Sequence, residues 1–249
     1  MSTWVLLRGL TRGSGHWGPF IRSMQRQINA AAVVALDLPG NGLLNGLQSP
    51  TTIDAMTTSC RERLQAMGVE PPFYLLAVSM GAMVATEWAA RAPQVVSGCV
   101  LVNTSFAGIN PWHQRLRPSS YATLLSIAFA ARTSAQREAA ILRLTSRNTR
   151  AAAAVVEEWT ALRDAHPVSG RNALRQLLAA ARYRPPLVAP NLPLLVLSSG
   201  RDALVDPHCA RVLATRWHCA SATHPWAGHD LTLDDGPWVA ARIREWLKA

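Results

Sequence analysis

The sequence predicts an α/β fold, with a mostly parallel sheet of about six strands covered by helices on both faces. Of its 249 residues, 49% are hydrophobic and 16% are charged, which suits one large domain with a sizeable core. Several short apolar runs are continuous rather than alternating, as is typical of strands buried on both faces. Helix-length segments separate these runs, and such alternation favours a doubly wound sheet.

The apolar runs predict five main strands, and a shorter segment predicts a sixth. The main strands are expected at Thr3–Leu7, Val33–Leu36, Phe73–Val78, Cys99–Val102 and Leu194–Leu197. The short strand-like segment is Cys219–Thr223, just before the last loop. Helices are expected between or after these strands at Ile53–Met67, Met80–Ala92 and Trp238–Leu247. Pro93 ends the second of these helices because it has no backbone N–H and cannot continue one.

One long stretch, Phe106–Ala189, carries helical patterns and no convincing strand. Four helices are expected within it, at Tyr121–Ala131, Ser134–Thr145, Ala151–Ala165 and Gly170–Tyr183. We interpret it as a four-helix lid inserted after the fourth of the five main strands. Residues 1–105 and 190–249 then form the core, and residues 106–189 form the lid of the same domain.

The charge is uneven along the chain. The formal net charge is +10, but the segment 106–189 alone carries 12 arginines and four acids, or +8, which leaves +2 for the rest. A solvated helical surface in an arginine-rich chain is one interpretation, and a site for an acidic partner is the other. No nucleic-acid-binding motif accompanies the charge, so nucleic acid is not the expected partner. Two tight groups stand out, namely Arg115 and Arg117, and Arg143, Arg147 and Arg150.

Several classes of protein are not expected. No apolar run reaches the roughly 18 residues of a membrane-spanning helix. The first residues enter a strand-like run without the pattern of a secretory signal, so a cytoplasmic protein is expected. The four cysteines form no CxxC pair, and metal ligands are not clustered, so no metal site is expected.

The segment Ala77-Val78-Ser79-Met80-Gly81 lies between a predicted strand and a predicted helix. A serine at such a sharp turn needs small neighbours, which Ala77 and Gly81 supply. Its hydroxyl is held clear of the sheet at a helix N-terminus, where backbone N–H groups stabilise developing negative charge. We therefore predict that Ser79 is a nucleophile rather than a simple helix cap.

A serine nucleophile needs a base and an acid that orients the base. Asp202 follows the Leu194–Leu197 strand, and Asp206 is the alternative acid four residues later. His229 precedes the last helix, and His224 is an alternative base. The order Ser79, Asp202, His229 is the order in which hydrolases with this type of turn carry their triad.

The loop after the first strand, Arg8 to Trp17, contains three glycines that let the backbone approach a ligand. The N–H of Leu10, together with the N–H of Met80, is predicted to form a two-donor oxyanion hole. His16 and Trp17, in the same loop, are predicted to line the substrate site.

At this point the chain resembles the α/β-hydrolase superfamily, and in particular small lidded carboxylesterases of the pimeloyl-[acyl-carrier protein] methyl ester esterase type. The resemblance rests on Arg8-Gly9-Leu10, the glycine turn 37–42, the Ser79 turn, Gly200-Arg201-Asp202 and Gly228-His229. It implies an α/β-hydrolase fold, a triad of Ser79, Asp202 and His229, an oxyanion hole of the Leu10 and Met80 amides, and an arginine-rich lid that receives an acidic carrier protein.

Two departures from this family matter. The family usually has His-Gly after the first strand, whereas this sequence has Arg8-Gly9, so the hydrogen bonds of the loop must differ. The antiparallel hairpin that usually precedes the first strand is not in the sequence, so a smaller sheet of about six strands is expected.

The expected function is that of a cofactor-independent serine carboxylesterase that works through an acyl-enzyme on a small-molecule ester. Candidate substrates include an acyl-carrier-linked or anionic ester. The same triad also serves thioesterases, lactonases, carbon–carbon bond hydrolases and some lyases. A hydrolase-fold small-molecule receptor is the alternative from another class, although a receptor has no need of a complete triad.

Overall fold

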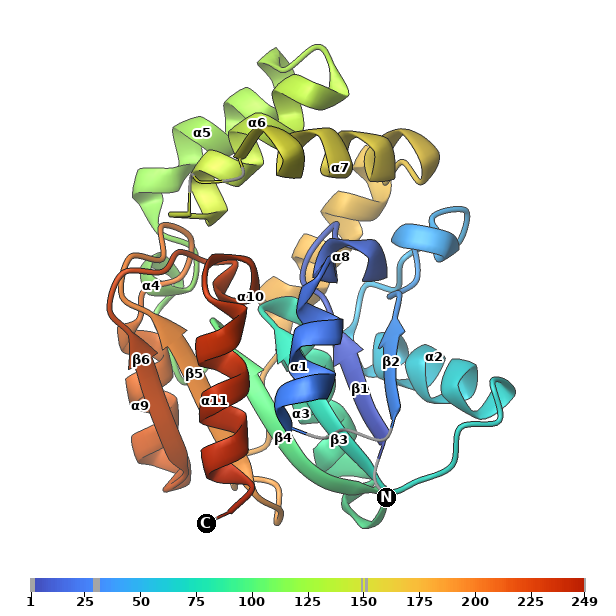
Figure 1. Cartoon of the computed structure of the whole chain (residues 1–249), viewed down its shortest axis with the longest axis vertical. Coiled ribbons are helices and arrows are strands. Elements are labelled where there is room, and N and C mark those ends of the chain that lie inside the picture. Colours follow the sequence, from blue (N-terminus) through green and yellow to red (C-terminus); the bar gives the residue numbers. More distant parts are fainter. Residues whose placement is uncertain (1–2, 29–31, 149, 151, 249) are drawn as a thin grey trace.

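Six parallel strands form the centre of the fold (Figure 1). The computed structural model describes residues 3–28, 32–148, 150 and 152–248. The strand order in the sheet is β2-β1-β3-β4-β5-β6, and every neighbouring pair is parallel. The strands are β1 (Thr3–Leu7), β2 (Ala32–Leu36), β3 (Phe73–Val78), β4 (Val96–Val102), β5 (Leu194–Ser199) and β6 (Ala220–His224). The predicted sheet of about six strands is therefore confirmed.

Side chains of each strand alternate between two hydrophobic cores, because successive residues of a strand point to opposite faces. In β3, Leu75 and Ala77 lie in the larger core, while Leu76 and Val78 lie in the smaller one. The larger core also holds residues of α2 (Ile53–Ala66), α3 (Met80–Arg91) and α9 (His208–Trp217). On the other face, α1 (Phe20–Ile28) and α11 (Gly236–Trp246) pack against the sheet and against each other. Burial on both faces explains why the central strands β1, β3 and β4 are largely apolar, whereas the edge strand β6 is mostly exposed and carries Ser221 and Thr223.

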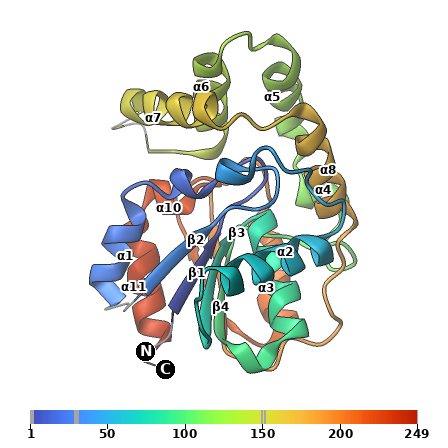
Figure 2. The ribbon, with the colours of Figure 1, turned by 90° about the vertical axis from the view of Figure 1, so that its right-hand side faces the viewer.

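The chain between β4 and β5 is helical, as expected. It holds α4 (Trp112–Arg115), α5 (Tyr121–Leu125), α6 (Ser134–Thr145), α7 (Ala152–Ala165) and α8 (Gly170–Arg182). Figures 1 and 2 show α5, α6 and α7 as a layer beyond the sheet, with α6 against α7. The predicted helix Tyr121–Ala131 is divided into α5 and a π-helical turn at Ser126–Ala130. Residue 151, the expected start of the third helix, lies outside the described residues.

The last insert helix, α8, differs from the other three predicted ones in its packing. Its Ala179 and the following Tyr183 are buried in the larger core of the sheet. Its polar face is buried as well, where Gln176 bonds to the Thr11 N–H and to Asn41. The helix α8 therefore packs as part of the body of the domain, whereas α6 and α7 form the outer layer.

The structure also contains elements that the sequence patterns did not indicate. These include α1, α4 and a short 3₁₀ turn at Ser14–Trp17 in the loop after β1. The strand β4 begins three residues before the predicted start, at Val96. Among the described residues, no helix combines the length and the apolar character that a membrane crossing requires.

Candidate active site

Ser79 occupies the turn between β3 and α3 in a backbone conformation that residues with a side chain rarely adopt. Its φ is 56° and its ψ is −119°, a strained region for any residue except glycine. Its N–H donates to the Val102 carbonyl at 2.8 Å, and its own carbonyl accepts from the Thr104 hydroxyl at 3.0 Å. These bonds hold the turn to the end of β4, so the strand–serine–helix turn that the sequence predicts is present.

Two glycines allow other backbone segments to approach Ser79. A Cβ at Gly81 would lie 2.5 Å from the Leu7 carbonyl oxygen and 2.6 Å from that of Arg8. A Cβ at Gly9 would lie 3.1 Å from the Ser79 Cβ. Any larger residue would push the end of β1 away from the start of α3. The loop after β1 therefore lies directly against the serine turn.

The N–H groups of Leu10 and Met80, predicted to form the oxyanion hole, come from these two adjoining segments. Neither group donates a hydrogen bond to any part of the chain that the structure describes. Backbone donors are seldom left unpaired in folded proteins. Unpaired donors beside a serine turn are suited to an oxyanion that forms only during a reaction.

His229 and Asp202 form the second half of the site. The His229 Nδ1–H donates to the Asp202 carboxylate at 2.7 Å, and both residues are buried. The other Asp202 oxygen accepts the N–H groups of Leu204 and Val205 at 2.7 and 3.0 Å. Burial lowers the pKa of His229, but the charge and hydrogen bond of Asp202 outweigh burial and raise it above its ordinary value. The carboxylate therefore fixes the ring, directs Nδ1 inward and leaves Nε2 as the free nitrogen.

The alternative acid and base have other partners. Asp206 accepts the N–H of His208 at 2.8 Å, at the start of α9. His224 is buried between the Asp235 carboxylate and the N–H of Ala227, at 3.2 and 3.1 Å. Both residues thus hold local structure, and of the two pairs that the sequence offered, Asp202 and His229 are the ones that meet.

Ser79 and His229 are each bonded to one of two consecutive residues at the end of β4. No hydrogen bond joins the Ser79 hydroxyl to His229 among the described residues. Val102 accepts the Ser79 N–H, and the next residue, Asn103, donates from Nδ2 to the His229 carbonyl at 2.7 Å. Asn103 was missed by sequence reasoning. In the sequence it is marked only by its position directly after a predicted buried strand. In the structure its φ is +47°, a conformation that asparagine tolerates better than most residues.

Arg8 stands where the family that this chain resembles usually has histidine. Its Nη1 donates to Asp230 at 3.1 Å and to the Thr232 hydroxyl at 3.2 Å, and its Nη2 forms a second bond to Asp230. The guanidinium also lies 4.9 Å from the centre of the Trp17 ring. The loop after β1 is therefore bonded to the residue that follows His229.

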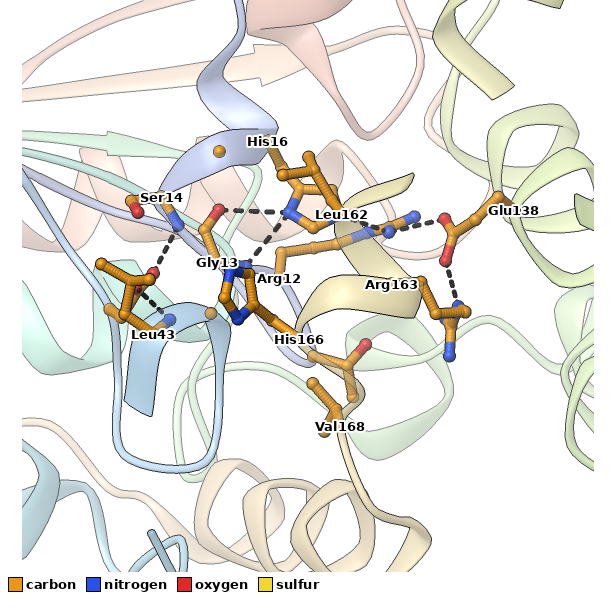
Figure 3. A pocket seen from close by; sticks show the side chains of 14 residues that line it. Arg12, Gly13, Ser14, His16, Leu43, Glu138, Leu162, Arg163, His166 and Val168 are labelled. Atoms are coloured by element: carbon orange, nitrogen blue, oxygen red, sulfur yellow. Dashed lines mark hydrogen bonds and ion pairs between the residues drawn. The ribbon is translucent and has the colours of Figure 1, made fainter. Parts of the chain in front are cut away.

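A cavity of about 220 Å³ lies between the loops after β1 and β2 and the helices α6 and α7 (Figure 3). Beside it, the fully buried Glu138 forms ion pairs with Arg12, at 2.7 Å, and with Arg163. His16 lines the same cavity, where burial and the Arg12 charge lower the pKa of the ring to about 2 and keep it neutral. Ser79, Asp202 and His229 are not among the lining residues.

The remaining predicted binding residues differ in their exposure and in their hydrogen-bond partners. Trp17 is only 2% exposed and packs in the smaller core, and its contact with a substrate stays a prediction. Arg115 caps the end of α8 through the carbonyls of residues 180 and 181, and Arg117 donates to the Asp202 carbonyl at 3.0 Å. These two arginines serve the fold. Arg147 follows α6 and donates to the carbonyls of Arg143 and Ser146 at the end of that helix, while Arg143 and Arg150 are exposed.

No group of three or more His, Cys, Asp or Glu side chains within the described ranges is arranged to hold a metal ion. The four cysteines are free, three of them buried. Burial raises the pKa of Cys60 to about 12 and that of Cys219 to about 11. The thiols are therefore protonated and unreactive near neutral pH.

Comparison with known proteins gives consistent matches along nearly the whole chain. A family model described as the alpha/beta hydrolase family matches residues 4–242. A candidate carbamate hydrolase, RutD of Klebsiella pneumoniae, is 28% identical, covering 98% of this chain and 91% of that protein. The pimeloyl-[acyl-carrier protein] methyl ester esterase of Serratia marcescens is 28% identical, covering 73% of this chain and 70% of that protein.

A solved structure with the same fold is the enol-lactonase of Burkholderia xenovorans, with a TM-score of 0.77 and 15% identity. The superposition covers 100% of this chain and 92% of the lactonase. At that identity the likeness concerns the fold alone.

Proposed function

Because this chain belongs to the alpha/beta hydrolase family, we propose that it is a serine hydrolase that cleaves a carboxylic ester through an acyl-enzyme. One observation carries the proposal. The buried Asp202–His229 pair and the strained Ser79 turn are joined through consecutive residues at the end of β4. Two free backbone donors lie beside the serine. This set of groups supplies a nucleophile, a base, an orienting acid and an oxyanion site.

In the proposed reaction, the Ser79 hydroxyl attacks the ester carbonyl and His229 Nε2 takes its proton. Asp202 stabilises the resulting imidazolium and keeps its orientation. The N–H groups of Leu10 and Met80 bind the negative oxygen of the tetrahedral intermediate. When the intermediate collapses, His229 returns the proton to the leaving alcohol. A water molecule, deprotonated by His229, then attacks the acyl-enzyme and releases the acid and Ser79.

A series of p-nitrophenyl esters of graded acyl length tests this reaction class. We expect steady turnover by the wild type, with an optimum acyl length, and a rapid initial release of p-nitrophenol where deacylation is slow. A phosphonate that labels serine hydrolases should add once to the wild type and not to Ser79→Ala. Equal turnover by both proteins, or labelling at another residue, would refute the proposal.

We further propose that the preferred ester carries a negative charge, either on its acyl chain or on a carrier protein. The support is the charge of +8 on residues 106–189 against +2 elsewhere, together with the likeness to an esterase whose name includes an acyl-carrier protein. Arg143 and Arg150 are the exposed members of the predicted groups. Such charges speed the encounter with an anion and hold it near the site.

The double variant Arg143→Glu/Arg150→Glu should raise KM for an anionic ester and leave KM for a neutral ester of the same length unchanged. Added salt should have the same selective effect on the wild type. Arg61→Glu, an exposed reversal on α2, is the matched control and should change neither value. Equal effects on both esters would mean that the arginines form only a solvated surface.

A second candidate reaction is the hydrolysis of a carbamate, which the RutD likeness over 98% of this chain favours. The same serine attack applies, but the leaving group is an amine or an alcohol attached to a less electrophilic carbonyl. A matched pair of p-nitrophenyl carbamate and p-nitrophenyl ester distinguishes the two. A kcat/KM for the carbamate that exceeds that for the ester would replace the ester assignment.

A further inference from the structure

Two charged side chains that the proposed reaction does not use are buried beside its base. Arg8 and Asp230 are each 4% exposed and meet through both guanidinium Nη atoms and both carboxylate oxygens. The Thr232 hydroxyl completes the cluster, accepting from Arg8 Nη1 at 3.2 Å and donating to Asp230 at 3.0 Å. A two-point guanidinium–carboxylate pair fixes orientation as well as distance.

The backbone around this pair touches the other parts of the site. The carbonyl of Arg8 lies against Gly81 in α3, and the next residue, Gly9, lies against Ser79. Asp230 directly follows His229, and its N–H donates to the Thr145 carbonyl at the end of α6 at 2.8 Å. We call the loop after β1, residues 8–17, the oxyanion loop, and the loop after β6, residues 225–230, the base loop. One ion pair between residues 222 positions apart therefore connects the oxyanion loop and the serine turn to the base loop.

We propose that the Arg8–Asp230 pair is a positioning element that holds the base loop against the oxyanion loop. Its two opposite charges also cancel each other beside the His229 imidazole. This inference rests on the proposed serine mechanism. Neither residue touches the reacting atoms, so both are positioning residues and not catalytic ones.

The charges that face His229 come from three segments. Asp202 projects from the loop after β5, Asp230 from the base loop and Arg8 from the loop after β1. Asp230 raises the pKa of His229, and Arg8 lowers it. Among the described residues, the side chains bonded to the rest of the base loop are the neutral Asn103, the Asp234 carboxylate, which accepts the Gly228 N–H at 2.6 Å, and the His224 ring, which accepts the Ala227 N–H at 3.1 Å. Arg12 lies farther along the oxyanion loop, and its charge adds to that of Arg8 in lowering the pKa of Asp230.

If one side chain of the Arg8–Asp230 pair is neutralised, the charge of the other should no longer be cancelled at His229. Burial alone would raise the pKa of Asp230, but the Arg8 charge holds it below its ordinary value, so the wild-type pair is ionised. In Arg8→Gln the remaining carboxylate favours the imidazolium. In Asp230→Asn the remaining guanidinium disfavours it. The two single variants are expected to move the ionisation of His229 in opposite directions.

The test measures kcat/KM against pH for Arg8→Gln, Asp230→Asn and the double variant. The acid limb should move up by about one pH unit in Arg8→Gln and down by a similar amount in Asp230→Asn. The double variant should return to the wild-type midpoint. All three should lose about tenfold to a hundredfold in kcat with little change in KM, because misplaced groups slow the chemistry more than binding.

Arg8→Lys separates charge from geometry. It keeps the positive charge but not the planar two-point contact, so its acid limb should stay at the wild-type pH while kcat falls. Arg91→Gln removes the guanidinium of an exposed ion pair with Asp54 and Glu87 and should change neither quantity. Shifts of the same sign in both charge-removing variants, or no shift in either, would overturn the proposal.

A titration of the His229 ring by NMR, in full-length proteins that also carry Ser79→Ala, measures the same ionisation without activity. The opposite shifts should appear there whether or not the substrate is an ester. Their presence with no esterase activity would refute the proposed reaction and support the pair. Their absence in an active enzyme would do the reverse. Circular dichroism of each variant confirms that the compared proteins are folded.

Discussion

Ser79, the proposed nucleophile, has a backbone conformation that costs free energy. Its φ of 56° places its backbone in a region that is strained for a residue with a side chain, at a cost of about 1–3 kcal/mol. We expect both Ser79→Ala and Ser79→Gly to lose activity by a factor on the order of 10⁶. Only glycine relieves the strain, so Ser79→Gly should be about 1 kcal/mol more stable to unfolding than Ser79→Ala. Equal stability in urea denaturation would mean that the turn is unstrained.

Asp202 determines both the orientation and the protonation of His229. Its bond to Nδ1 raises the pKa of His229, so activity should fall as the pH drops through a value above the ordinary 6.5. Asp202→Asn should reduce kcat by about 10⁴-fold, because an amide favours the wrong ring tautomer. Its residual activity should persist to lower pH than in the wild type, since the raising charge is gone.

Asp206→Asn provides the matched comparison, because among the described residues the Asp206 side chain bonds only to the His208 N–H at the start of α9. It should keep kcat within about twofold and leave the acid limb in place. A larger loss in Asp206→Asn than in Asp202→Asn would assign the acid to the later position. The same measurements in both variants, a pH profile and a melting temperature, distinguish a change in chemistry from a change in folding.

At the scale of elements, the contact between β1 and α3 depends on the absence of a side chain at Gly81. A Cβ there would approach two backbone oxygens to 2.5 and 2.6 Å, and backbone cannot rotate away as a side chain does. Gly81→Ala should therefore displace the Leu10 and Met80 donors, reduce kcat at least 10²-fold and destabilise the protein by about 2 kcal/mol.

Gly46→Ala is the control for that substitution, because no atom lies within 4 Å of the added Cβ. It should leave kcat unchanged and change stability by less than about 1 kcal/mol. Similar losses in both variants would show that the effect of alanine at Gly81 does not come from the close backbone approach.

The helices α6 and α7 are joined to the body of the domain by a buried carboxylate. Glu138 lies between Arg12 of the oxyanion loop and Arg163 of α7, and Arg12 also stacks 4.2 Å from the centre of the Trp159 ring. Glu138→Gln leaves two guanidinium groups without a counter-charge, which should cost about 3 kcal/mol in urea unfolding. Glu62→Gln, exposed on α2, should cost almost nothing.

Some elements could be predicted from sequence better than others, for physical reasons. Strands buried on both faces produce continuous apolar runs, so β3 was predicted to the residue. The helix α1 was missed although Phe20, Met24 and Ile28 follow a helical spacing and pack in the smaller core, because its nine residues are fewer than the roughly 11–18 over which such a period is recognised. The interpretation of the insert as a four-helix lid did not anticipate α8 packing into the core, since burial of the polar Gln176 gives no hydrophobic signal.

For the proposed site, motif and order predicted Ser79, Asp202 and His229 from their residue types and their places at strand ends, and the structure pairs Asp202 with His229. The contacts that join them could not be predicted. Asn103 and the Arg8–Asp230 pair connect segments that are distant in sequence, and no local pattern marks such a partner. Composition suggested a role for Arg115 and Arg117 in binding, which stays a prediction, and it gave no sign that both donate to backbone carbonyls.

At the scale of the whole molecule, the sheet is assembled from two parts of the chain that are far apart in sequence. The strands β1 to β4 lie within the first 102 residues and carry Ser79. The strands β5 and β6 follow Leu194 and position Asp202 and His229. Between the parts, Val102 of β4 pairs with Leu197 of β5 across the whole insert.

This arrangement has a consequence for how the protein acquires activity as it folds. Pairing of β4 with β5 requires closure of a long loop, which is slow because chain entropy is lost before contacts repay it. During synthesis the part that carries Ser79 leaves the ribosome well before Asp202 and His229. In refolding from urea, far-ultraviolet circular dichroism should therefore recover before turnover does. Joint recovery in one phase would mean that the two halves form together, and the active site would then arise with the sheet instead of as its last addition.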